Sequence, residues 1–244
     1  MRNVGIIFRR ELASYFVTPL AYVFIFFFLV LAGAFTFYLG GFYDSNQADL
    51  GPFFTYLPWL FLFLIPAISM RLWAEERSSG SIELLTTLPV TLPQAVIGKY
   101  LAAWCFAGIA LALTFPIWMT AAWLGDPDNG AIFIGYVGSL LMAGGFLAIG
   151  SCMSALTRNQ VIAFILAAFT GFLFLLSAFP LVLDFFQGFL PRAIVDAIAG
   201  FSFLMRFQSI SKGVLDLRDL LYFLMFIGLW LASTVIVLDI KKAE

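Results

Sequence analysis

The residue types that could do chemistry are concentrated in one stretch, MRLWAEERSSGSIELLTTLPVTLPQAVIGKY, residues 70–100. The whole chain is 63% hydrophobic and only 11% charged, yet Glu75, Glu76, Arg77 and Glu83 stand close together here. Serine and glycine separate these charges, and proline follows them. Such a polar patch in an apolar chain predicts a surface that meets water or a protein partner.

The composition excludes most catalytic chemistry. The chain has no histidine, which removes His-ligated haem and zinc, Ser–His and Cys–His nucleophile pairs and imidazole proton relays. Cys105 and Cys152 lie in apolar runs without metal-type spacing and are predicted to be buried thiols. The segment VIGKY contains Gly-Lys but lacks the rest of a phosphate-binding loop. We therefore predict no enzyme activity, no cofactor and no metal in this chain, and an external source of energy.

The elements that position the patch must belong to a membrane protein. The mean hydropathy is +1.03 and 18% of the residues are aromatic, whereas about a quarter of a soluble domain is charged. A span needs roughly 20 mostly apolar residues. Six stretches qualify: 20–39, 53–70, 101–123, 132–156, 161–183 and 220–238. The predicted fold class is an all-α polytopic membrane protein with six transmembrane helices, forming one domain over residues 1–244.

The distribution of basic residues predicts the orientation of the spans. One side carries Arg2, Arg9, Arg10, Arg71, Arg77, Lys99, Arg158, Lys241 and Lys242. The other side carries Arg192, Arg206, Lys212 and Arg218. Because cytoplasmic connections are enriched in Lys and Arg, both termini are predicted to be cytoplasmic, with the chain in the plasma (inner) membrane of a bacterium. There is no basic tract of the kind that binds nucleic acid.

An amphipathic helix is predicted before the first span. Apolar residues recur every three to four positions over residues 2–17, with Arg9, Arg10 and Glu11 between them. The pair Thr18-Pro19 then turns the chain into the span. We expect residues 1–19 to form a cytoplasmic helix in the membrane interface, the alternative being a basic flank that only fixes topology.

Two short helices are predicted on the outer side, within residues 184–219. The segments PRAIVDAIAG and FSFLMRFQSISKG are too apolar for free loop and too short to span, and Gly200 and Gly213 suit C-caps. Asp216 is expected to cap the last span, with Asp219 in its first turn.

The connection formed by residues 71–99 is predicted to contain a helix outside the membrane, over residues 75–88. Ile82, Leu84, Leu85 and Leu88 supply its apolar side, and the charged residues supply its polar side. A helix of this kind is suited to dock on a soluble partner.

This connection resembles the cytoplasmic loop between the second and third spans of ABC-2-type transporter permeases. The matching residues are Glu75, Glu76, Arg77, Gly80, Glu83, Leu84, Leu85, Pro89, Gly98 and Lys99. Ser81 stands where threonine is usual. The resemblance implies a coupling helix seated in a groove of a separate cytoplasmic ABC ATPase, and ATP and magnesium would be held by that ATPase.

A second resemblance concerns the start of the last span. GVLDLRDLLYFLMFIGLWL, residues 213–231, with Gly213, Asp216, Arg218 and Asp219, is similar to the branch of gliding-motility and nitrous-oxide-reductase-maturation permeases. That branch often has His-Phe upstream, and this chain has Arg206-Phe207. The implied architecture is like that of a type V ABC exporter, with the outer helices re-entrant.

The favoured hypothesis is a permease subunit of an ABC exporter. Two copies, or one copy with a paralogous permease, would assemble with two ATPase subunits in membrane lipid, and an extracytoplasmic accessory protein is a further possible partner. An ion-coupled secondary transporter is the alternative, but it should show intramembrane ionisable residues and inverted repeats. A force-transmitting ABC subunit without cargo is the third hypothesis, and a membrane enzyme the fourth.

Overall fold

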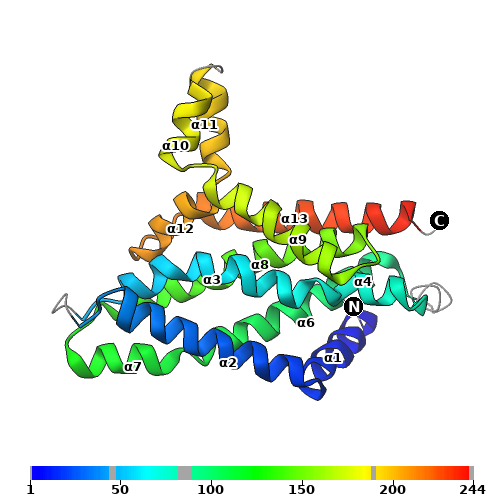
Figure 1. The fold of residues 1–244 in the computed structure, drawn as a ribbon, viewed down its shortest axis with the longest axis horizontal. Helices are drawn as coiled ribbons and strands as arrows, with labels where there is room; N and C mark the ends of the chain where they lie inside the picture. Colours follow the sequence, from blue (N-terminus) through cyan, green and yellow to red (C-terminus); the bar gives the residue numbers. More distant parts are fainter. Residues whose placement is uncertain (1, 44–47, 82–89, 188–190, 242–244) are drawn as a thin grey trace.

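The computed structural model describes residues 2–43, 48–81, 90–187, 191–241, and their regular structure is helical throughout. Figure 1 shows a bundle of long helices with a short helical arm projecting from its side. The elements are α1 (Arg2–Val17), α2 (Pro19–Ala34), the π-helix η1 (Phe35–Leu39), α3 (Gly51–Ser69), α4 (Arg71–Ser78), α6 (Leu92–Ala112), α7 (Phe115–Leu124), α8 (Asn129–Leu156), α9 (Gln160–Leu176), α10 (Pro180–Gln187), α11 (Arg192–Gly200), α12 (Phe203–Ser211) and α13 (Leu217–Ile240).

Over the described residues, five continuous helical stretches are long and apolar enough to cross a membrane. They are Ala21–Leu39, Gly51–Ser78, Leu92–Leu124, Asn129–Leu156 and Leu217–Ile240. A sixth exists only if α9 and α10, bent by 76° at their junction, are counted as one span. The fifth span predicted at 161–183 corresponds to α9 and the start of α10, and it stays a prediction because of this bend. Pro180 begins α10, and proline disfavours helical continuation both by its missing N–H and by its effect on the preceding residue.

α8 is the central helix of the bundle, and small residues let its neighbours approach it closely. A Cβ built on Gly150 would lie 1.9 Å from Oγ of Ser69 in α3, and one on Gly145 would lie 2.9 Å from the ring of Phe203 in α12. Helices pack at short distances in membranes through such small residues. The sequence of α8 thus fits a helix that is surrounded on several sides.

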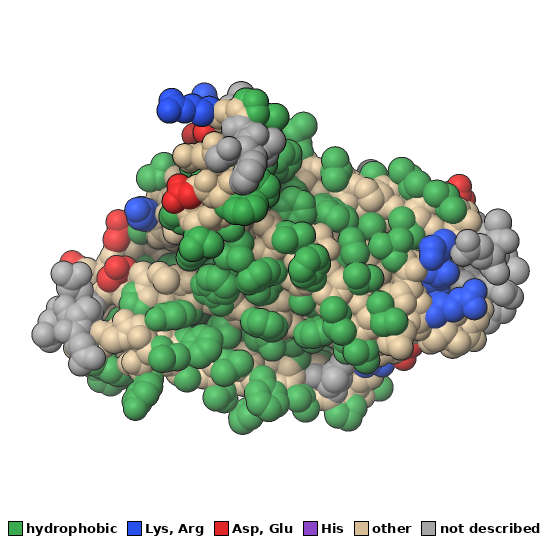
Figure 2. All heavy atoms as spheres, turned by 45° about the horizontal axis from the view of Figure 1, so that its top comes forward, with side chains coloured by type: hydrophobic (Ala, Val, Ile, Leu, Met, Phe, Trp, Pro, Cys, Tyr) green, Lys and Arg blue, Asp and Glu red, His purple; other side chains and the backbone are tan. Residues whose placement is uncertain are grey.

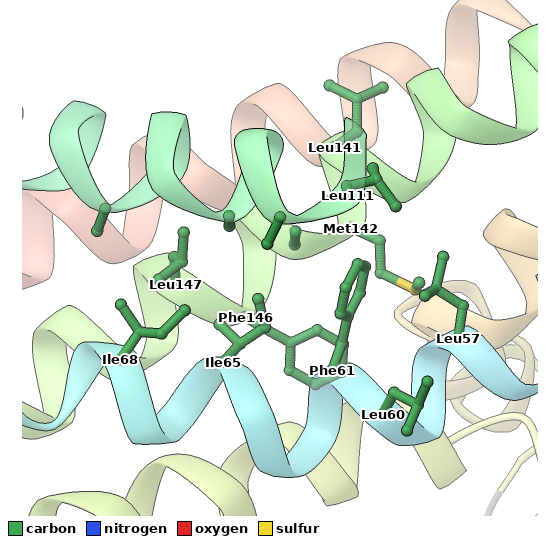
Figure 3. Packing of buried hydrophobic residues seen from close by; sticks show 14 of the residues in the cluster. Leu57, Leu60, Phe61, Ile65, Ile68, Leu111, Leu141, Met142, Phe146 and Leu147 are labelled. Atoms are coloured by element: carbon green, nitrogen blue, oxygen red, sulfur yellow. The ribbon is translucent and has the colours of Figure 1, made fainter. Parts of the chain in front are cut away.

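The core is built mainly between α3 and α8. In Figure 3, Phe61 and Ile65 of α3 point toward Phe146 and Met142 of α8. All four side chains are at most 2% exposed. Interdigitated apolar side chains of this kind hold the two helices at a fixed separation.

The face of the molecule in Figure 2 is apolar over its middle and carries its charged side chains toward the ends. Large side chains such as Phe26, Phe63, Phe169 and Leu229 are each more than half exposed. Contiguous apolar surface on this scale needs an apolar solvent, and the helices satisfy their own backbone groups as a lipid environment requires. The fold is that of a multi-pass membrane protein.

The two ends of the bundle carry different elements. The end that we call the N-terminal end holds α1, the tip of α4, the start of α9 and the chain's C-terminus, as Figure 1 shows. The helix predicted over residues 2–17 is confirmed as α1, and Thr18 is the N-cap of α2 with Pro19 in its first turn. The end that we call the opposite end holds α7, α12 and the start of α13.

The two short helices predicted before the last span are confirmed as α11 and α12, with one difference at their ends. Gly213 follows α12 with a φ of 86°, as a glycine C-cap requires, but the C-cap of α11 is Phe201 rather than Gly200. A third short helix, α10, was not predicted. In Figure 1, α10 and α11 together form the arm that projects from the bundle.

Candidate functional site

The polar patch begins on a helix that continues out of the second span. α3 and α4 together cover Gly51–Ser78, or 28 residues. At 1.5 Å per residue that is roughly 42 Å, longer than the hydrocarbon core of roughly 30 Å. α4 is therefore expected to extend beyond the hydrocarbon core at the N-terminal end of the bundle. Within the connection predicted over residues 71–99, α4 forms the beginning, and α6 begins at Leu92 behind a Thr91–Gln94 capping box.

The helix predicted over residues 75–88 is interrupted after its first turn. α4 ends at Ser78, and Gly80 has a φ of 72°, a left-handed conformation that L side chains rarely adopt. A Cβ built on Gly80 meets nothing within 4 Å, so glycine is favoured here by backbone conformation and not by space. Glu83, Leu84, Leu85 and Pro89 lie outside the described residues.

A buried serine of α8 caps the start of α4. Oγ of Ser154 accepts from the backbone N–H groups of Trp73 and Ala74, both at 3.0 Å, and donates to the carbonyl oxygen of Met70 at 2.8 Å. The first N–H groups of a helix lack intrahelical acceptors, so this hydroxyl replaces a local N-cap. Ser154 thereby fixes the direction in which α4 leaves the span.

Two further bonds hold the inner face of α4 against the end of α8. Nε1 of Trp73 donates to Oγ of Ser151 at 3.1 Å. The Arg77 guanidinium, 9% exposed, donates to the carbonyl oxygen of Ala155 at 2.6 Å. A displacement of α4 must therefore move α8 or break several buried hydrogen bonds.

Lys99 lies where three helices meet. Its ammonium is 2.8 Å from Oε1 of Glu76 in α4 and 3.3 Å from Oε1 of Glu11 in α1. It also lies 5.3 Å from the centroid of the Trp73 ring. The Lys99 side chain is only 4% exposed, so its charge is balanced within the chain.

The exposed face of the patch is smaller than the sequence suggested. Glu75, Ser78, Ser79 and Gly80 are exposed, and Glu75 pairs with Arg71 one turn earlier at 2.8 Å. The hydroxyl of Ser79 bonds to the carbonyl oxygen of Glu75 at 2.9 Å, which closes the end of α4. These residues remain available to a partner.

The predicted coupling residues therefore separate into two groups. Glu75, Gly80 and the half-buried Ser81 lie at the tip of α4, where Oγ of Ser81 is 2.9 Å from Oγ of Ser79. Glu76, Arg77 and Lys99 instead make contacts inside the chain.

The predicted residues of the interfacial helix also divide. Arg9 and Arg10 are exposed on α1, whereas the Glu11 carboxylate points toward Lys99. We call Arg10, Glu11, Glu76 and Lys99, which are linked by ion pairs, the Lys99 cluster. NH2 of Arg10 donates to Oε1 of Glu11 at 2.6 Å, and this hydrogen bond raises the pKa of Arg10 above its ordinary value. The polar side of α1 thus takes part in the charge cluster.

The predicted outer residues come together at the start of α13. Asp216 accepts from the backbone N–H of Arg218 at 3.1 Å, which confirms the predicted N-cap. Asp219 is confirmed in the first turn, and it also pairs with Arg206 of α12 at 3.0 Å, an ion pair that the sequence did not reveal. Phe207 is buried beside Phe54 of α3. The cluster ties α12 to α13.

Trp73, Ser151 and Ser154 were not predicted from the sequence. The available signal was the i, i+3 spacing of the two serines within the apolar run of α8, which places them on one helix face. Their partner was not predictable from that spacing. Among the described residues, no group of three or more His, Cys, Asp or Glu side chains could hold a metal ion.

A bundle of apolar helices that are long enough to cross a membrane, with charged residues at its ends, is typical of a polytopic membrane protein. The candidate site consists of hydrogen bonds and ion pairs between its helices. The family model of the CcmB protein matches residues 6–183 of the chain. The chain therefore belongs to the CcmB family, an ABC-type family of membrane permeases. The match includes α4 and the Lys99 cluster but ends before α11. No curated protein matches the chain.

Proposed function

We propose that the chain is the permease subunit of an ATP-driven ABC exporter, powered by a separate cytoplasmic ATPase that docks on the tip of α4 and the connection after it. CcmB-type permeases function with an ABC ATPase partner. The observation that supports the proposal is that α4 has an exposed tip and a buried inner face. Its tip is exposed at Glu75 and Ser78–Gly80, while its inner face is bonded to α8.

This geometry suits the transmission of force. A partner that pushes on the exposed tip acts on a helix whose first turn is capped by Ser154 and whose side is held through Trp73 and Arg77. Packed elements move as units because interiors are close-packed. A displacement at the tip would therefore reach α8, the central helix of the bundle.

The proposed assembly contains two ATPase subunits and either a second copy of this permease or a paralogous one. An extracytoplasmic accessory protein is a further proposed partner, and ATP and magnesium belong to the ATPase. The Lys and Arg asymmetry supports cytoplasmic termini and a bacterial inner membrane as the location. The ABC-2 motif in residues 75–99 supports an ABC-2-type permease, and the gliding-motility branch stays a prediction.

The alternatives are less well supported. An ion-coupled transporter needs ionisable groups within its spans, and two candidates, Lys99 and Asp219, are committed to ion pairs with residues of other helices. A force-transmitting ABC subunit without cargo uses the same docking surface and stays open. The CcmB family is of the haem-exporter permease type. This chain has no histidine, so any haem cargo would pass it without imidazole ligation.

The docking surface is tested by charge reversal at Glu75, which is exposed at the tip of α4, and at Glu83 in the connection after it. We expect Glu75→Lys and Glu83→Lys to reduce co-purification of the ATPase with the chain and to reduce ATP turnover of the remaining complex. The reason is that the introduced lysine would face the positive charge of the ATPase that pairs with the glutamate in the parent. Asp126→Lys, at an exposed position of the opposite end, is the matched control and should assemble like the parent. Normal assembly and turnover in both loop variants would refute the docking surface.

A further inference from the structure

Lys99 joins three segments that are far apart in the sequence. It stands near the start of α6, and its one ammonium lies within ion-pair distance of Glu76 in α4 and Glu11 in α1. Oε1 of Glu11 also forms an ion pair with a second cation, the guanidinium of Arg10. The four charges alternate in sign from Arg10 to Glu76, so the cluster is neutral as a whole and Lys99 is its centre.

α1 and α6 are in tight contact beside this cluster. A Cβ built on Gly98, the residue before Lys99, would lie 2.8 Å from the Ile7 side chain of α1. α1 is therefore seated on α6 by packing at Gly98 and by charge at Lys99. α4 reaches the same point through the carboxylate of Glu76 and through the ring of Trp73, which lies 5.3 Å from the Lys99 ammonium.

Space is available next to the cluster. A cavity between α1, α2, α3, α4 and α6 has Glu11, Glu76 and Lys99 in its wall together with the apolar side chains of Phe24, Ile68 and Phe106. Because one side of the cluster faces a cavity, the paired side chains of Glu11, Lys99 and Glu76 can move together without meeting packed neighbours on that side. A close-packed setting would not allow such a shift.

We propose that Lys99 is a positioning residue that transmits displacement of α4 to the N-terminal helix α1. This inference rests on the proposed function, since the ATPase supplies the displacement. When α4 moves, the carboxylate of Glu76 moves with it. The ammonium of Lys99 follows that carboxylate, and the carboxylate of Glu11 on α1 follows the ammonium. The predicted consequence is that α1 moves in step with the nucleotide state of the ATPase.

The test measures a distance that depends on α1. Spin labels are placed at two exposed positions, Ala13→Cys on α1 and Val161→Cys on α9, in a chain otherwise free of cysteine and in complex with the ATPase that co-purifies with the parent. We expect the distance between the labels to change when ATP is added to the parent. We expect that change to be lost in Lys99→Met and retained in Lys99→Arg.

A second variant guards against a simple folding defect. Lys99→Met leaves two carboxylates with one remaining cation, whereas Lys99→Met combined with Glu76→Gln leaves the neutral Arg10–Glu11 pair. The double variant should fold, bind the ATPase because the Lys99 side chain is only 4% exposed, and still lack the ATP-dependent change at α1. A structural role alone would not remove that change from an assembled complex.

The outcomes distinguish this inference from the proposed function. Failure of the parent chain to recover an ATPase would overturn the proposed function. An ATP-dependent change that persists in the double variant, or a parent complex whose α1 does not respond to ATP, would overturn the role of Lys99 and leave the docking surface intact.

Discussion

Replacing Ser154 with alanine should destabilise the protein more than its small change in volume suggests. The hydroxyl of Ser154 is fully buried and serves three backbone groups of another segment, the N–H groups of Trp73 and Ala74 and the carbonyl of Met70. In Ser154→Ala, these groups lose their partner where water cannot replace it. The first turn of α4 would then lack its cap.

The magnitude follows from the number of groups affected. Each buried polar group left without a partner costs about 1–3 kcal/mol, and the loss of an N-cap costs about 0.5–2 kcal/mol. Since a shift of α4 can partly restore the bonds, we expect a loss of about 2–4 kcal/mol in the free energy of unfolding. For a chain of this size, that corresponds to a decrease in Tm of about 4–16 °C.

Ser139 provides a matched control on the same helix. It is also fully buried, but its hydroxyl donates only to the carbonyl oxygen of Gly135, one turn earlier in α8, at 2.7 Å. Ser139→Ala removes the same atom without stripping a backbone group of another helix, and should cost about 0.5–1 kcal/mol. Thermal unfolding of both variants, purified in the same detergent and followed by circular dichroism, makes the comparison.

The comparison can refute the reasoning. Equal Tm values for Ser154→Ala and Ser139→Ala would mean that the hydroxyl of Ser154 does not cap α4. The proposed transmission from α4 to α8 would then lose one of its supports.

Three further predictions concern the tip of α4, the opposite end and the topology. Gly80→Val should reduce co-purification of the ATPase, because a left-handed conformation costs about 1–2 kcal/mol for an L side chain, whereas Gly80→Asn should retain it. Asp219→Asn should lower the free energy of unfolding by about 1–2 kcal/mol, since Arg206 is one-third exposed, and a double-mutant cycle with Arg206→Gln should show coupling. Single cysteines at Ser79 and Asn129 should label from opposite sides of the membrane in a cysteine-free background, and labelling from one side would refute the orientation.

Local features were predicted well from the sequence. The helix of residues 2–17, the turn at Thr18 and Pro19 and the cap at Asp216 follow from residue preferences over a few positions. The bend at Pro180 was harder to predict, since proline is tolerated inside membrane helices where neighbours satisfy the backbone. Pro66 shows this within α3, which continues past it to Ser69.

The candidate site was found in the sequence but its inner and outer residues were not told apart. Glu75 and Glu76 are adjacent and chemically alike, yet one is exposed and the other meets Lys99. Helical periodicity separates their directions by about 100° but does not say which direction holds a partner. That depends on where α1 and α6 pass.

The sequence by itself determined that this protein is a helical membrane protein with an acidic, glycine-containing patch near a span, because lipid imposes a composition and helices impose a period. Only the tertiary structure decided what the patch does inside the chain. Ser154 caps α4, and Lys99 binds Glu11 and Glu76, because distant segments pack side by side. Hydrogen bonds and ion pairs act over a few ångströms of space, so their partners are set by the fold rather than by position along the chain.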